Sequence, residues 1–183
     1  ATEDQSTVNQ MTGTSSTDLP PDKTLPKNPT ADWSTDLQDP NVIQAMRRSA
    51  ERVGLTSRKT TRNEESDIVV KDTATGACSE TQHSGVGSET NFDVGVLGEN
   101  EEIAAAWHVH TFNGDVGGMR YWENPNMSPT DPGVYASMKD APWGNNLYVL
   151  GPNYIWHYHP VSQAFIPVAR TSSWLGIKTY PSP

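Results

Sequence analysis

Apolar residues are sparse up to about residue 36 and then recur, with the spacing of regular secondary structure, to the end of the chain. The first segment, residues 1–36, is rich in Ser, Thr, Asp and Pro, which predicts an extended or disordered arm without secondary structure. Residues 37–183 hold enough apolar positions to build one domain with its own core. Trp33 and Leu37 are the expected anchors between the arm and the domain.

Helical spacing is clearest after residue 39. Asp39 is a suitable N-cap, Pro40 fits the first helical position, and Gly54 is a typical helix terminator. Between them, apolar residues recur on one face of the predicted helix, at Val42, Ile43, Met46, Ala50 and Val53. This pattern predicts an amphipathic helix packed on a sheet.

The remaining apolar stretches are short and favour strands. A hairpin region is expected over residues 72–100, with a short strand near residues 92–96, and a short helix is expected after Asp131. The predicted strands cover residues 64–71, 103–110, 147–150, 154–158 and 164–169, with an edge strand at 172–177. Strands mixed with a few helices predict an α/β (α+β) fold, a mixed β-sheet with flanking helices.

Composition excludes several classes of protein. The chain carries 22 acidic and 13 basic residues, a net charge of −9, and no run of Lys or Arg longer than two, so we expect no nucleic-acid partner. Its single cysteine, Cys78, excludes an intramolecular disulfide and a cysteine-rich zinc site. No apolar run approaches the length of a membrane span or of a signal peptide. Because the first residue is Ala, we expect a processed or excised piece, and localisation stays open.

The strongest candidate chemistry lies between residues 107 and 131. In a strand, His108 and His110 point to the same side and lie roughly 6.5–7 Å apart, so both can bind one ion. The later Ser-x-x-Asp spacing predicts a helix start, with Ser128 as cap and Asp131 in the first turn. Two imidazoles, one carboxylate and a water form a typical catalytic zinc site. The expected metal ligands are therefore His108, His110 and Asp131.

A His-x-His pair followed by Ser-x-x-Asp resembles the signature of the JAB/MPN (JAMM) metalloproteases. The resemblance covers about residues 60–160 and implies that family's cytidine-deaminase-like architecture. It is nearest to the branch found at the C-terminal ends of bacterial RHS-repeat and polymorphic toxin proteins, where a Tyr-Leu-Gly-type strand follows, as in residues 148–151 here. This chain departs from the family in having Thr111 where Pro is frequent, and a longer insert before Ser128.

The resemblance also implies roles. Glu64 matches the family's upstream acid and would act as general base, with Glu65 as the other candidate, because strand alternation alone cannot choose between them. Ser128 would donate a hydrogen bond to the oxyanion. The implied activity is zinc-dependent cleavage of a peptide or isopeptide bond in a protein or peptide substrate. The toxin branch further implies an effector domain delivered as part of a larger protein and restrained by a cognate inhibitor (immunity) protein.

Alternatives remain open at this point. A cupin-like metal site also uses His-x-His, although its later Glu is replaced here by Asp115, and a JAB/MPN-like domain without activity would serve as a binding module. A second pair, His157 and His159, is expected to be a polar strand face, since no acidic residue follows Asp140. The glycine- and aromatic-rich insert at residues 111–127 is either a flap over the site or a packed Ω-loop.

Overall fold

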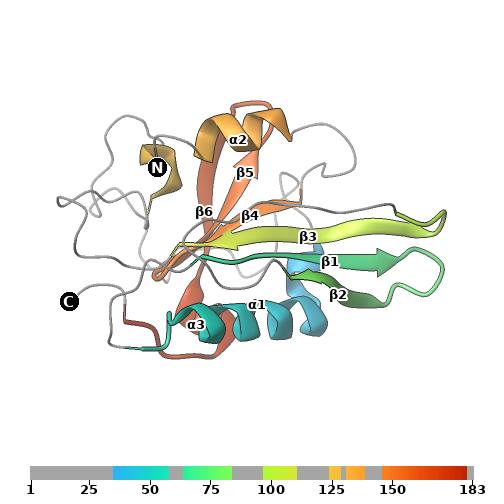
Figure 1. Ribbon diagram of the computed structural model, residues 1–183, viewed down its shortest axis with the longest axis horizontal. Coiled ribbons are helices and arrows are strands. Elements are labelled where there is room, and N and C mark those ends of the chain that lie inside the picture. The colour runs from blue at the N-terminus through green and yellow to red at the C-terminus, as the bar shows by residue number, and fades with distance from the viewer. Residues whose placement is uncertain are drawn as a thin grey trace.

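The computed structural model describes residues 35–57, 64–83, 97–110, 124–128, 131–138 and 146–180. These residues form an α+β fold, in which a six-stranded mixed sheet carries α-helices on both faces (Figure 1). None of the described helices is long and apolar enough to cross a membrane. In chain order the elements are η3 (Thr35–Gln38), α1 (Pro40–Val53), β1 (Ser66–Asp72), β2 (Cys78–His83), β3 (Glu101–Val109), η4 (Pro125–Met127), α2 (Asp131–Ser137), β4 (Leu147–Leu150), β5 (Tyr154–His159), β6 (Ala164–Arg170) and α3 (Thr171–Leu175).

The strands lie in the order β2-β1-β3-β4-β5-β6 across the sheet. β3 and β4 run parallel, whereas the other neighbouring strands run antiparallel. Helices α1 and α3 lie together on one face of the sheet, and α2 lies on the opposite face (Figure 1). The sheet therefore separates two buried layers, which we call the α1 face and the α2 face.

Helix α1 begins and ends where its sequence predicts. The Asp39 carboxylate accepts a hydrogen bond from the backbone N–H of Asn41 at 2.8 Å, as an N-cap does. Gly54 adopts a left-handed conformation with φ 94°, and its N–H reaches the carbonyl oxygens of Ala50 and Glu51. The apolar stripe of α1 is buried against the sheet, which confirms the predicted amphipathic helix.

Strand β3 crosses the middle of the sheet and is buried on both faces from Ile103 onwards. A β-bulge interrupts its pairing with β1, since Val69 lies opposite Ala105 whereas Val70 lies opposite Ile103. Beyond the bulge, Ala106 packs in the core of the α2 face, whereas Trp107 and Val109 pack in the core of the α1 face. By strand alternation His108 therefore faces α2.

One predicted element is wrong. Residues 172–177 do not form an edge strand, because Thr171–Leu175 folds into the short helix α3, which ends at Gly176 with φ 65°. Two contacts from distant parts of the chain hold this helix: Arg47 Nε donates to the Leu175 carbonyl at 2.8 Å, and Trp174 Nε1 donates to the Leu37 carbonyl at 3.2 Å. Long-range packing thus overrides the local strand pattern.

The first described element, η3, begins at Thr35, two residues before the expected start of the domain at residue 37. Asp36 belongs to η3 and forms an ion pair with Lys71 at 3.1 Å, and Leu37 is fully buried, as expected of an anchor. Trp33 and the rest of the expected arm, residues 1–34, lie outside the described residues. So do the expected short strand at residues 92–96 and most of the insert, residues 111–123.

The outer edge of β6 is covered at Phe165. The Asn126 side chain of η4 donates its Nδ2 to the Phe165 carbonyl and accepts from the Phe165 N–H through Oδ1, each at 2.8 Å. These two bonds replace those of a seventh strand at this residue. They also tie η4 to the sheet just before Ser128.

Candidate metal centre

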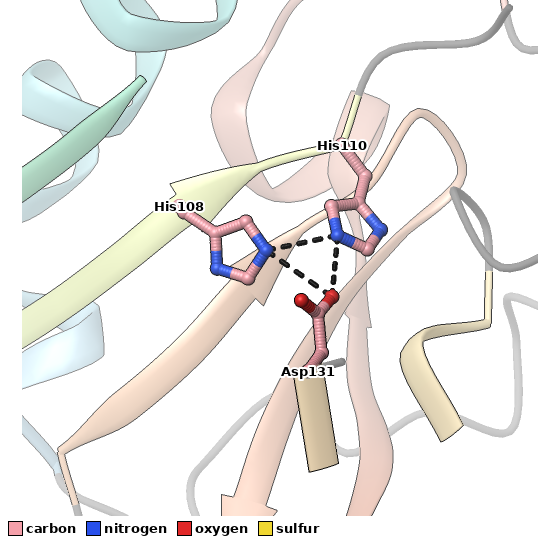
Figure 2. A group of neighbouring side chains, drawn as sticks. All are labelled: His108, His110 and Asp131. Carbon is pink, nitrogen blue, oxygen red and sulfur yellow. Dashed lines mark hydrogen bonds and ion pairs between the residues drawn. The ribbon is translucent and has the colours of Figure 1, made fainter. Parts of the chain in front are cut away.

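Three potential metal ligands from β3 and α2 converge on the α2 face of the sheet. His108 lies near the C-terminal end of β3 and His110 directly follows that strand; they are 5 % and 4 % exposed and point toward Asp131 in the first turn of α2 (Figure 2). The Nε2 atoms of the two histidines are 2.8 Å apart, and Asp131 Oδ2 lies 3.3 Å from His108 Nε2 and 2.6 Å from His110 Nε2. The structure thus brings together the three residues that the sequence predicts as ligands.

The donor set fits zinc chemically and, after a small expansion, geometrically. Zinc binds imidazole nitrogen and carboxylate oxygen at about 2.0–2.2 Å, so tetrahedral ligand atoms are separated by roughly 3.3 Å. The separation of 3.3 Å already has this value, whereas those of 2.8 and 2.6 Å are shorter than it. Among the described residues, this is the one group of His, Cys, Asp and Glu side chains close enough to share an ion.

Asp131 is ionised in this arrangement. Its burial alone would raise the pKa of the carboxyl group, but hydrogen bonds and charge interactions with His108 and His110 outweigh burial and lower the pKa well below its usual range. The backbone N–H of Asp131 donates to Ser128 Oγ at 3.1 Å, the contact expected of a capping serine three residues upstream. Ser128 is itself buried beside the ligands.

The other ring nitrogen of His108 is also engaged. Nδ1 lies 2.8 Å from the hydroxyl oxygen of Tyr135, and this hydroxyl donates to the backbone carbonyl oxygen of Tyr148. Burial raises the pKa of Tyr135 well above its usual value, and the negative charges of Asp131 and Glu64 raise it further. The phenol therefore stays protonated beside the ligands.

The neighbouring acids Glu64 and Glu65 lie on opposite faces. Glu65 is fully buried on the α1 face, where Arg52 binds its carboxylate with two hydrogen bonds, Nε to Oε1 at 2.8 Å and Nη2 to Oε2 at 2.6 Å. The N–H of Val109 donates to the carbonyl of Glu65, and Ser66 lies opposite His108. Alternation along this stretch places Glu64 on the His108 side of the sheet, and its charge acts on Tyr135.

His108, His110 and Asp131 are called the metal group below. A cluster of ionisable residues lies on the opposite side of the sheet, on the α1 face. Arg52 also contacts Asp67 Oδ1 at 3.3 Å and Glu80 Oε2 at 3.4 Å. Ser49 Oγ accepts from Trp107 Nε1 at 3.2 Å and donates to Asp67 Oδ2 at 2.7 Å. Burial raises the pKa of Asp67 to about 10, and its hydrogen bond with Glu65 adds to this shift. Asp67 is therefore a neutral acid at pH 7.

The second histidine pair does not join the metal group. His157 lies opposite Tyr148 in the sheet, and its ring centroid is 5.3 Å from that of Tyr148 and 4.9 Å from that of His159. Tyr148 packs in the core of the α1 face, so alternation along β5 places both histidines on that face. They are thus on the side of the sheet opposite His108.

Three residues around the site were not predicted from the sequence: Tyr135, which contacts His108, and the pair Arg52 and Asp67 on the α1 face. For Tyr135 a signal existed, because it lies four residues after Asp131 and so on the same side of α2. For Arg52 and Asp67 none existed, since their contact joins positions on a helix and a strand that periodicity alone cannot align.

Comparisons with models of protein families, with curated proteins and with solved structures found no match to this chain. The metal group and its surroundings therefore carry the functional argument.

Proposed function

We propose that this chain is a zinc-dependent hydrolase of the JAB/MPN type, which cleaves a peptide or isopeptide bond in a protein or peptide substrate. The observation that carries the proposal is the convergence of His108, His110 and Asp131 at the junction of β3 and α2. The placement of Glu64 on the same face, and of the Ser128 hydroxyl beside Asp131, supports it further. Together these five residues match the family signature residue by residue.

Each residue has a chemical task in this proposal. His108, His110 and Asp131 would hold the zinc ion, which when bound acidifies a water molecule and polarises the scissile carbonyl. Glu64 takes a proton from the attacking water and returns it to the departing amine as the C–N bond breaks. Ser128 Oγ accepts the N–H of Asp131, and in this proposal its hydroxyl donates a hydrogen bond to the oxyanion.

The open sheet argues against the cupin alternative. A cupin site lies inside a β-barrel, whereas the sheet formed by the described residues ends at β2 and β6 without closing, and the carboxylate ligand comes from the start of a helix. A binding module without activity is distinguished by experiment.

Zinc analysis tests the ligand set. The purified protein should hold about one zinc ion per chain, and His108→Ala or Asp131→Ala should lose it, because two protein ligands leave an incomplete shell. His159→Ala is the control: it also removes an imidazole, but from the opposite face of the sheet, and should keep full zinc content. Full zinc retention in either ligand variant would refute the assignment.

Substitution of Glu64 tests hydrolysis separately from metal binding. Glu64→Gln should keep its zinc and its fold yet lose on the order of 10²–10⁴ in rate on a peptide or isopeptide conjugate, because an amide cannot act as a base. Glu102→Gln, an exposed change on β3, is the control. Full zinc content with no cleavage of any conjugate by the unaltered protein would favour the binding module.

A further inference from the structure

The hydroxyl of Tyr135 lies between His108 and the backbone of β4. It donates to the carbonyl oxygen of Tyr148, an atom that can only accept. A phenol has a single proton, so at its second contact, 2.8 Å from His108 Nδ1, the oxygen must act as acceptor. The Nδ1 atom of His108 therefore carries a proton.

A neutral imidazole has one proton on its two nitrogens, so a proton on Nδ1 leaves Nε2 of His108 with a lone pair instead of a proton. Nε2 is the atom that faces the other two ligands, 2.8 Å from His110 Nε2 and 3.3 Å from Asp131 Oδ2. When the His108 ring is neutral, the contact between the two Nε2 atoms has His110 as donor and His108 as acceptor. The same atom is the one that a metal ion needs.

We propose that Tyr135 is a positioning residue of the metal centre, whose hydroxyl holds His108 in the Nδ1-protonated tautomer and so keeps Nε2 directed at the ion. The inference rests on the proposed function only for the identity of the ion. Metal-bound histidines generally donate their second ring N–H to such a partner, and loss of the partner weakens metal binding.

Packing fixes the position of the phenol. The Tyr135 ring is 1 % exposed and lies against the rings of Phe165, Tyr158 and His108, with centroid distances of 5.0, 5.5 and 5.5 Å. Because Tyr135 follows Asp131 by one helical turn, α2 supplies both a ligand and the residue that orients another ligand. A shift of α2 would therefore disturb two parts of the centre together.

Tyr135→Phe tests the inference because it keeps the ring and removes the hydroxyl. Tyr158→Phe is the matched control: its ring packs in the same cluster, and its hydroxyl is buried without a hydrogen-bond partner in the described part of the chain. The first readout is the tautomer of His108 in metal-free protein at pH 8, from long-range ¹H–¹⁵N NMR. Only five histidines contribute to this spectrum, and a His108→Gln variant assigns the signal.

The unaltered protein and Tyr158→Phe should show His108 protonated at Nδ1, whereas Tyr135→Phe should show protonation shifted toward Nε2. The second readout is the Kd for zinc, which should rise about 10- to 100-fold in Tyr135→Phe and stay unchanged in Tyr158→Phe. Protonation at Nε2 in the unaltered protein would overturn the inference even if Tyr135→Phe failed to fold. So would a Tyr135→Phe protein with unchanged tautomer and zinc Kd.

The two proposals fail in different ways. If the unaltered protein bound no zinc but Tyr135→Phe changed the tautomer, the hydrolase proposal would fall and the role of Tyr135 in orienting His108 would stand. If zinc bound tightly and Tyr135→Phe changed neither readout, the role of Tyr135 would be refuted and the hydrolase proposal would stand.

Discussion

A single residue of α1, Arg52, decides which of the two neighbouring carboxylates before β1 faces away from His108. The family resemblance favours Glu64, but strand alternation leaves Glu64 and Glu65 equivalent, because both precede the same strand. The distinction comes from Arg52, which takes Glu65 onto the α1 face with two short hydrogen bonds. The contact between Arg52 and Glu65, 13 positions apart, thus assigns Glu65 to the α1 face, which alternation alone cannot do.

Glu65→Gln should lower the free energy of unfolding by about 1–3 kcal/mol, because Arg52 loses its closest charged partner in a buried place. The loss stays moderate because Asp67 and Glu80 also contact Arg52. Urea unfolding measures the change. The control is Glu51→Gln, an exposed substitution next to Arg52 on α1, whose free energy of unfolding should stay within about 0.5 kcal/mol of that of the unaltered protein. Equal stability of all three proteins would show that the Arg52 pair does not hold this stretch.

Asp67 makes stability depend on pH. Its pKa is raised to about 10 in the folded chain, against 3.8 for an ordinary aspartate, so between these values the folded state keeps a proton that the unfolded state has released. Stability should therefore fall as pH rises through this window. Burial and the hydrogen bonds with Glu65 and Glu80 raise the pKa of Asp67, whereas the hydrogen bond from Ser49 lowers it. Arg52 also contacts the Asp67 carboxyl group.

Asp67→Asn isolates this effect, because an amide resembles the neutral acid and cannot ionise. The melting temperature of the unaltered protein should decline from pH 5 to pH 9, and that of Asp67→Asn should decline less, so that the variant becomes the more stable protein at pH 9. Calorimetry at several pH values gives the comparison. Parallel pH profiles would mean that Asp67 is ionised in the folded protein.

At the scale of elements, local signals predict most of the structure. The cap, the apolar stripe and Gly54 define α1, and the strands of the second half end within a residue or two of their predicted limits. The grouping of His108, His110 and Asp131 is likewise predicted by local signals, namely strand alternation and a Ser-x-x-Asp helix start. Helix α3 was missed because residues more than a hundred positions away hold it, although Gly176 offered a terminator signal.

The N-cap of α1 gives a direct test of one such signal. Asp39→Ala should cost about 1 kcal/mol, because the N–H of Asn41 loses its acceptor, whereas Asp39→Asn should cost only a few tenths, since asparagine caps equally well. Urea unfolding of both variants separates the cap from general effects of the substitution. If both lost the same stability, the charge of Asp39 rather than its capping bond would be the cause.

At the scale of the whole molecule, the sheet separates two kinds of polar chemistry. The α2 face holds the metal group, and the α1 face holds the cluster around Arg52 and Asp67. Strands β1 and β3 connect them, since Glu64, Ser66 and His108 face one side, and Glu65, Asp67 and Trp107 the other. This division could not be predicted from sequence, because it depends on the bulge in β3 and on the pairing of β1 with β3.

The boundary of the folded unit can be tested by truncation. A chain that starts at Trp33 should melt within a few degrees of the full chain, because residues 1–32 contain few apolar side chains to bury. A chain that starts at Asp39 loses the buried Leu37 and its contact with Trp174, and should melt roughly 5–10 °C lower. If the two truncated chains melted at similar temperatures, η3 would not contribute to the stability of the core.

The covered edge of β6 affects the tendency of the protein to self-associate at high concentration. An exposed strand edge invites pairing with the same edge of another copy, which is a common start of aggregation. Here Asn126 already engages both backbone groups of Phe165, and Pro167, two residues further along the strand, has no N–H to offer. This margin of the sheet is therefore a poor template for a further strand, and self-association through β6 is disfavoured while η4 stays in place.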